Sequence, residues 1–261
     1  MTDFRLRLYW DSFAMIDCAL PPLAEQKKIA EILSAQDKLI ALKEKLIEEK
    51  KRQKKYLMQQ LLTGKKRLPG FSGEWDTIRL SKIFNEGNKI GVSDTSQYKK
   101  MTVKLGFKGL EFTKTDREMV DTRPFYVRKK GEIIIGKQNY FNGSVALVTD
   151  EFDGCICSNA IMSFSVIDAD HKFVLEYISQ TDFMRKHEML ANGTGQKELS
   201  EKDFLSFEIQ FPCIAEQKCI GEIASTCDKE ITLLQNELGQ EKQKKKALMQ
   251  LLLSGVVRVN V

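Results

Sequence analysis

The residues best suited to chemistry in this chain form one stretch, Lys137 to Ser144, which reads KQNYFNGS. It holds one cation, amides that can pair with the edges of DNA bases, and aromatic rings that can stack on bases or wedge between them. This chemistry is recognition rather than bond making. An ordinary polar hairpin loop would have the same composition, so both interpretations stay open. As DNA contacts the stretch offers Lys137, Gln138, Asn139, Tyr140 and Asn142.

Further candidate contacts lie elsewhere in the chain. Lysine and arginine neutralise phosphates and position a protein on DNA, whereas amides and hydroxyls reach base edges. Gln196 and Lys197 end a glycine-containing segment, NGTGQK, that could close onto a groove. The other candidates of these kinds are Lys104, Lys108, Lys114, Arg117, Ser158 and Asn159. We expect Arg128, Lys129 and Lys130 to form a surface turn rather than to read bases.

Groups that could catalyse a reaction or hold a metal lack the required arrangement. The only histidines, His171 and His187, are expected on or near one surface helix, and the six cysteines lack the paired spacing of a zinc site. Cys155 and Cys157 are expected to be buried thiols. The sequence has neither a glycine-rich phosphate loop nor the Asn-Pro-Pro-aromatic motif of an aminomethyltransferase. We therefore expect no catalytic residue, no metal ligand and no cofactor.

Charge and composition narrow the class of protein. The 261 residues carry a net charge of +5, which permits nucleic-acid binding without requiring it. The sequence is basic from about Lys99 to Lys137 and acidic from Asp150 on, so the basic stretch is the candidate for contact with a polyanion. No apolar run has the length of a membrane span. Scattered cysteines indicate a reducing compartment, and we expect a cytoplasmic protein without membrane contact.

A segment near the start of the chain returns near its end. The run that begins at Pro21 (PPLAEQKKIAEI) recurs at Pro212 (PCIAEQKCIGEI), and the run KKYLMQQLLTG that ends at Gly64 recurs as KKALMQLLLSG, ending at Gly255. The spacing between the copies never changes. A repeat without gaps around unrelated sequence indicates one structural element used twice, on either side of an inserted domain.

Both copies are predicted to be long helices. In the first, alternating steps of three and four along one helix face lead through Ile29, Ile32 or Leu33, Gln36, Leu39 or Ile40, Lys43, and Leu46 or Ile47. A stripe so narrow needs a partner helix, either antiparallel within the chain or in a second chain. The helix ends are broader apolar patches, suited to packing against the neighbouring domain or to docking another subunit. These patches contain Leu57, Met58, Leu61, Leu248, Met249 and Leu252.

The sequence between the helices is predicted to be an α+β domain. Strands are expected at residues 132–137, 144–149 and 160–166, and a helix from Phe173 to Met189. The expected division is 1–20 as the tail of a second, preceding inserted domain, 21–66 as the first helix, 67–208 as the inserted domain and 209–261 as the second helix. The short first segment fits a truncated gene, a recombined allele or a fragment made for expression.

Three features together resemble the specificity (S) subunit of type I restriction–modification systems. They are the paired PxxAEQKxIxEI helix starts at Pro21 and Pro212, the run RLPGF at Arg67 followed by Gly73-Glu74-Trp75, and the strand KGEIII at Lys130. The resemblance implies one mixed α/β DNA target recognition domain inserted between two long repeated helices that form an antiparallel coiled coil. The chain differs from the family's plan in lacking a first recognition domain.

The resemblance also implies a function without catalysis. The recognition domain would read a half-site in double-stranded DNA. The helices would dock methyltransferase (M) subunits and, through them, the restriction (R) subunit, which would do the chemistry. Two such chains could form a homodimer that reads a symmetric site. The alternative is a truncated S fragment that binds the M subunit as a structural or regulatory protein, without specific DNA binding.

Overall fold

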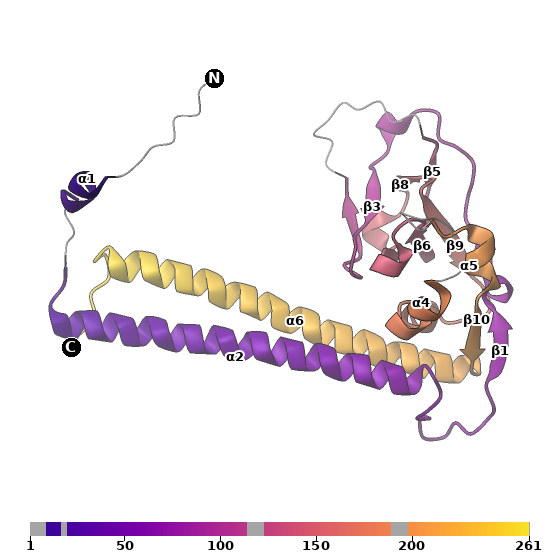
Figure 1. The fold of residues 1–261 in the computed structure, drawn as a ribbon, viewed down its shortest axis with the longest axis horizontal. Coiled ribbons are helices and arrows are strands. Elements are labelled where there is room, and N and C mark those ends of the chain that lie inside the picture. Colours follow the sequence, from indigo (N-terminus) through magenta and orange to yellow (C-terminus); the bar gives the residue numbers. More distant parts are fainter. Residues whose placement is uncertain (1–8, 17–19, 114–122, 189–197, 261) are drawn as a thin grey trace. The chain divides into compact units, whose positions relative to one another are not determined.

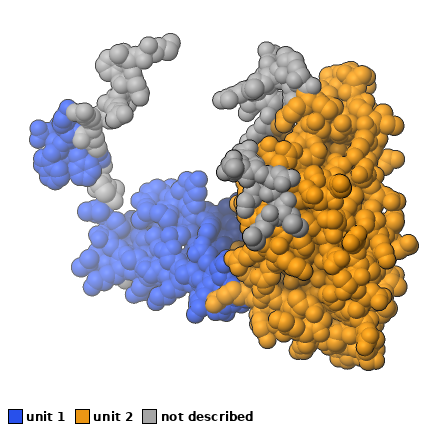
Figure 2. Space-filling model, turned by 45° about the vertical axis from the view of Figure 1, so that its right-hand side comes forward, with its two compact units in different colours: residues 1–50, 231–261 blue, residues 51–230 orange. Residues whose placement is uncertain are grey.

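The computed structural model describes residues 9–16, 20–113, 123–188 and 198–260. The chain divides into two compact units, residues 51–230 and residues 1–50 with 231–261 (Figure 2). Two long helices, α2 (Leu23–Leu61) and α6 (Ile214–Leu253), each contribute to both units (Figure 1). A short helix, α1 (Trp10–Ala14), precedes them. Among the described residues, no helix is both long and apolar enough to cross a membrane.

The two long helices pair within the chain, as one of the two predicted alternatives requires. In the unit that contains residue 1, Ile29, Ile40 and Ile47 of α2 are buried along the predicted stripe. Lys43 is paired with Glu237 and Asp37 with Lys245, so rising residue numbers on one helix meet falling numbers on the other. The helices are therefore antiparallel. Because the apolar stripes meet in three-four steps, the pair is a coiled coil.

One polar residue interrupts this stripe. Gln36 is 8% exposed, and its amide donates to the backbone carbonyl of Glu241 at 3.2 Å and to the Glu241 carboxylate at 2.6 Å. A buried amide is satisfied in only one alignment of the helices, so it fixes their register. Shortly after the last residue of each helix, a glycine adopts the left-handed conformation: Gly64 has φ 68° and Gly255 has φ 72°.

The unit of residues 51–230 is built on a four-stranded antiparallel sheet. Its order is β2 (Phe84–Glu86), β9 (Ile161–Val166), β6 (Glu132–Gly136) and β7 (Val145–Leu147). In the central strand Ile133, Ile134 and Ile135 are all fully buried. Alternate residues of a strand point to opposite faces, so Ile133 and Ile135 enter the main core while Ile134 enters a smaller second core. An uninterrupted apolar run is therefore required here.

Three two-stranded pairings complete the unit. They join β1 (Asp76–Arg79) to β10 (Glu208–Phe211), β3 (Met101–Val103) to β4 (Leu110–Phe112), and β5 (Phe125–Val127) to β8 (Ile156–Ser158). Short 3-10 helices connect several strands at Leu80–Lys82, Thr95–Gln97, Tyr140–Asn142 and Asp150–Phe152. A short helix, α5 (Glu201–Ser206), leads into β10 and buries Phe204.

The predicted helix from Phe173 to Met189 is wrong as one element. The structure has two helices there, α3 (His171–Ile178) and α4 (Thr181–Glu188). The buried side chains of α3 include Val174 and Ile178, and those of α4 include Phe183 and Met184. A straight helix would continue the first set to positions 181, 182 and 185, so that threonine, aspartate and arginine would enter the core. Because the chain breaks between α3 and α4, the buried face of α4 begins two residues later than a continuous helix would place it. The apolar side chains of both helices are therefore buried.

Candidate nucleic-acid interface

The stretch after β6 forms a closed turn that joins β6 to β7. Its backbone is fixed by hydrogen bonds from the amide of Gly143 to the carbonyl of Tyr140 (2.8 Å) and from the amide of Ser144 to the carbonyl of Asn139 (3.0 Å). Gln138, Asn139 and Asn142 are exposed. The amide of Asn142 also donates to the side-chain oxygen of Asn139 at 3.2 Å. Three of the five predicted contacts in this stretch therefore lie together on one exposed turn.

Tyr140 is not part of that exposed set, which corrects its prediction as a DNA contact. The side chain is fully buried, and its hydroxyl donates to the carbonyl of Ile178 at 2.6 Å. Burial raises the pKa of the phenol well above its ordinary value. The ring thus anchors the turn to α3. Ser158 is removed from the candidates for the same reason, because it is 8% exposed within β8.

A second loop, distant in sequence, lies against this turn. The tip of the β3–β4 hairpin donates from the amide of Gly106 to the carbonyl of Asn142 (2.8 Å) and from the amide of Phe107 to the carbonyl of Gly143 (2.9 Å). Gly143 has φ 77°, and a Cβ there would lie 3.0 Å from the amide nitrogen of Phe107. Only glycine allows the two backbones to approach so closely.

These bonds bring the predicted lysines of the hairpin to the amides of the turn. Lys108 is exposed, while Lys104 is half-buried and paired with Glu111 at 2.9 Å. We call the combined surface the loop face; it consists of Lys104, Phe107, Lys108, Gln138, Asn139 and Asn142. Sequence reasoning found the polar members separately and missed Phe107. The clustering of glycines at positions 106, 109 and 143 is the signal that could have joined the two loops.

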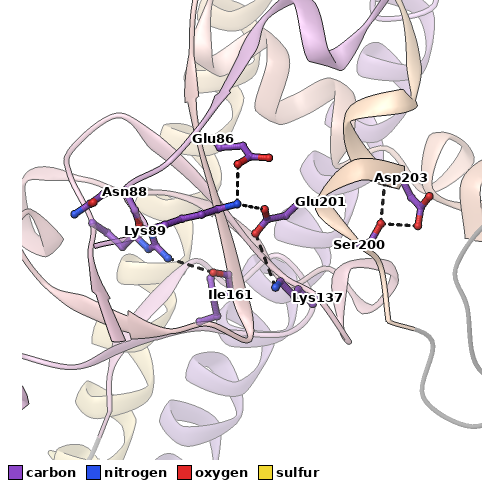
Figure 3. A network of polar contacts seen from close by, with 9 residues as sticks. Glu86, Asn88, Lys89, Lys137, Ile161, Ser200, Glu201 and Asp203 are labelled. Atoms are coloured by element: carbon purple, nitrogen blue, oxygen red, sulfur yellow. Dashed lines mark hydrogen bonds and ion pairs between the residues drawn. The ribbon is translucent and has the colours of Figure 1, made fainter. Parts of the chain in front are cut away.

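Lys137 is not part of the loop face and instead lines a cavity of about 440 Å³. Its ammonium lies 3.8 Å from a carboxylate oxygen of Glu201, and the other oxygen of Glu201 accepts from Lys89 at 2.5 Å (Figure 3). Lys89 also donates to Glu86 at 2.7 Å. Hydrogen bonding to Glu201, and then to Glu86, raises the pKa of Lys89. Asn159, another predicted contact, lines the same cavity and is exposed.

Arg128 also lines this cavity, and the expectation that it lies on a surface turn is wrong. It is 3% exposed, and its guanidinium donates to the thiol of Cys157 at 3.1 Å and to the carbonyl of Asn88 at 2.9 Å. The group also lies over the ring of Tyr126. Arg128 therefore ties three segments together. Cys155 and Cys157 are buried as predicted, and burial raises the pKa of both thiols.

The remaining candidate residues fall into two groups, those outside the described residues and those that are buried. Lys114, Arg117, Gln196 and Lys197 lie outside the described residues. His187 is buried rather than on a surface helix, and its ring stacks on Phe207 with centroids 4.0 Å apart. Burial lowers its pKa. In the described part of the chain, no group of three or more His, Cys, Asp or Glu side chains could hold a metal ion.

The AEQK runs at the two helix starts form the same hydrogen bonds and ion pairs in both copies. The glutamine of each AEQK run donates to the carbonyl of the preceding proline at 2.7 Å, from Gln26 to Pro21 and from Gln217 to Pro212. The adjacent glutamate of each run forms a two-pronged pair with an arginine. In the unit of residues 51–230 the pair is Glu216 with Arg67, and in the other unit it is Glu25 with Arg258. Each unit thus has the same clasp.

The apolar helix ends differ between the two units. Met58, Leu61 and Leu62 at the end of α2 are 4%, 2% and 0% exposed, within the main core. Leu57 packs against that core as well. Met58 and Leu61 are therefore not available to a partner, which corrects their prediction as docking residues, whereas Leu57 is half-buried.

The second copy of this patch, at the end of α6, is more open. Leu252 is 6% exposed and Leu248 is half-buried. Met249 and Leu253 are 38% and 62% exposed, although their counterparts in the first copy, Met58 and Leu62, are in the core. Of the six predicted docking residues, Met249 is therefore the one that is exposed, at 38%.

Comparison with known proteins agrees with this architecture. Two curated relatives are specificity subunits from Methanocaldococcus jannaschii. The chain is 27% identical over 270 residues to the type I restriction enzyme MjaVIII specificity subunit, covering 95% of this chain and 63% of the relative. It is 29% identical over 257 residues to the putative type I restriction enzyme MjaX specificity subunit, covering 92% and 59%. The chain thus spans about three-fifths of the curated relatives it matches.

Structure and family comparison point the same way. The fold is similar to the S subunit of a type I restriction–modification system from M. genitalium, with a TM-score of 0.58 at 16% identity, covering 88% of this chain and 61% of that one. The sequence model of the family described as "Type I restriction modification DNA specificity domain" matches residues 6–52 and 72–241. The chain therefore belongs to the type I restriction–modification DNA specificity family.

Proposed function

We propose that this chain is a DNA sequence-recognition subunit of a type I restriction–modification complex. In this proposal residues 67–208 read one half-site in double-stranded DNA, and the helical ranges 21–66 and 209–261 dock M subunits and, through them, the R subunit. Residues 1–20 would belong to a preceding recognition domain. The subunit itself would be non-catalytic, with the chemistry in its partners.

The observation that carries DNA reading is the loop face. Two loops separated in sequence are fixed to each other by two backbone hydrogen bonds, and together they present three amides and two lysines. Amides pair with adenine edges, and lysines position the protein on phosphates. Loops fixed before binding lose little conformational freedom on binding, which favours affinity and selectivity.

The test is selection from a pool of random duplexes by the full chain with its M subunit. The selected duplex is then compared with a scrambled one in binding to the double variant Gln138→Ala with Asn139→Ala. Each bidentate base contact that is lost should reduce discrimination by about 1–3 kcal/mol. A matched control replaces two amides outside the loop face, Asn85→Ala with Gln97→Ala. Equal losses for the selected and scrambled duplexes would rule out the turn as a reader.

A second candidate function is favoured by the open end of α6. Met249, Leu251, Leu253 and Val256 expose apolar side chains in one unit, whereas the equivalent Met58 and Leu62 are covered by the core of a recognition domain in the other. The equivalence supports docking of a further protein domain there, from an M subunit or a second copy of this chain. Such docking would not require specific DNA binding.

Light scattering of the chain alone and mixed with the M subunit tests this second function. Leu253→Asp should abolish assembly, because it places a charge in the apolar contact. Leu233→Asp is the matched control, since Leu233 is 63% exposed on the same helix. Assembly that both variants leave intact would exclude this patch as a docking surface.

A further inference from the structure

Phe107 combines exposure with an unfavourable backbone. Its φ is 59°, in the left-handed region that a residue with a Cβ rarely adopts, and its side chain is 48% exposed. The neighbouring positions that share this conformation, Gly106 and Gly109, are glycines. A glycine would adopt the same backbone at position 107 without that cost. The phenyl ring is thus present although it makes the tip of the hairpin harder to form.

Within the described part of the protein, the ring is not part of a packed core. It belongs to neither hydrophobic core, and it has no aromatic partner there. By contrast, Phe112 at the base of the same hairpin packs on Phe152 with ring centroids 4.6 Å apart. Strained residues that persist without a packing role concentrate at functional sites. A function outside the core is therefore the better account of Phe107.

The tip holds Phe107 in a fixed position. The amide of Phe107 donates to Gly143 at 2.9 Å, the amide of Gly106 donates to Asn142 at 2.8 Å, and the amide of Lys104 closes the hairpin on Gly109 at 2.9 Å. A backbone held on both sides does not need to reorganise when the ring meets a ligand. The point at which the ring leaves the backbone is therefore fixed before a ligand binds.

The surroundings of the ring fit a nucleic acid rather than an apolar protein groove. Lys104 and Lys108 flank it in sequence, and the amides of Gln138, Asn139 and Asn142 share its surface. Cations beside an apolar side chain are the arrangement by which proteins grip phosphates and insert a wedge between base pairs, which opens the stack and kinks the duplex. We infer that Phe107 is a wedge that enters a base step of the DNA half-site, an inference that rests on the proposed function.

The test uses the full chain with its M subunit and a selected duplex carrying 2-aminopurine at successive positions. Unstacking of 2-aminopurine raises its fluorescence, so the wild type should give a rise at one step. Phe107→Ala should abolish the rise and weaken binding of the selected duplex about tenfold, with binding of a scrambled duplex unchanged. Phe107→Trp should keep the rise. Leu105→Ala, which removes a neighbouring side chain that is 51% exposed, should behave as wild type.

Phe107→Gly separates a wedge from a structural role. Glycine relieves the backbone, so the variant should melt at or above the wild-type temperature while losing the fluorescence rise. A lower melting temperature together with the loss would show that the ring supports the fold, and would overturn the inference. A Phe107→Ala variant that keeps the fluorescence rise would also overturn the inference. So would a Phe107→Ala variant that no longer binds the M subunit but still distorts the DNA. If the wild type selects no duplex, the proposed function fails and the wedge fails with it.

Discussion

Replacing Glu201 with glutamine should strengthen DNA binding. In the free protein the Glu201 carboxylate is paired with two lysines, Lys89 at 2.5 Å and Lys137 at 3.8 Å. A lysine whose charge is already matched contributes less to a phosphate, so DNA must compete with Glu201 for both. Glutamine keeps the size and a hydrogen-bonding oxygen but removes the competing charge. It also removes an anion that repels the phosphates.

The expected magnitude follows from counterion release. Each additional phosphate contact steepens the dependence of log affinity on log salt by about 0.9. Glu201→Gln leaves Lys89 paired with Glu86 but frees Lys137, so the slope should steepen by roughly 0.9. On lowering salt from about 200 to about 50 mM, the ratio of the variant's affinity to that of the wild type should grow by a factor of roughly 3.5.

Fluorescence anisotropy of a labelled duplex across a salt series measures both quantities. The matched control is Glu208→Gln, which removes an exposed carboxylate that is 3.7 Å from Arg79 and does not line the cavity. Thermal melting checks that the loss of a first-turn acid on α5 has not loosened the fold. Weaker binding by Glu201→Gln, or stronger binding with an unchanged salt slope, would refute the idea that Glu201 withholds these lysines from DNA.

Three further outcomes follow from the buried groups and the loop contact. Tyr140→Phe should lower the free energy of unfolding by about 1 kcal/mol, because the Ile178 carbonyl loses its donor. Urea denaturation measures this loss. DNA affinity, measured by fluorescence anisotropy, should stay unchanged. Gly143→Ala should cost about 1–2 kcal/mol in the left-handed conformation alone and should weaken specific binding, since the new Cβ pushes the hairpin tip away. Because the pKa of His187 is lowered in the fold, the unfolded state binds more protons below about pH 6.5, and stability is lost as the pH falls through that window. His187→Gln should melt with less dependence on pH between about 5 and 7 than the wild type.

Local patterns in the sequence predicted the elements well where one face had to be buried. The three-four spacing around Ile29, Ile40 and Ile47 required a partner helix, and α6 supplies it. The run of isoleucines at 133–135 required burial on both faces, and the central strand provides it. The prediction of one helix over residues 173–189 missed the break between α3 and α4, although the apolar positions shift by two residues after Ile178.

Contacts between distant segments were beyond such patterns. Nothing local to Lys137 indicates that its ammonium is close to Glu201, and nothing local to Arg128 indicates burial beside Cys157. The contact between the hairpin tip and the turn at Gly143 uses backbone groups, which every residue has. Side-chain identity therefore carries almost no information about it. The glycine at 143 is the exception, because the close approach excludes any other residue.

The repeat places identical residue types at equivalent positions of two helix ends that differ in burial. Met58 and Met249 occupy equivalent positions, as do Leu62 and Leu253, and their residue types are identical. In one unit both side chains are buried, at 4% and 0%, and in the other they are 38% and 62% exposed. Both copies nevertheless keep the same glutamate–arginine clasp and the same left-handed glycine. The clasp and the left-handed glycine therefore form whether or not a domain covers the helix end. What the covering domain adds is the burial of the methionine and the leucine.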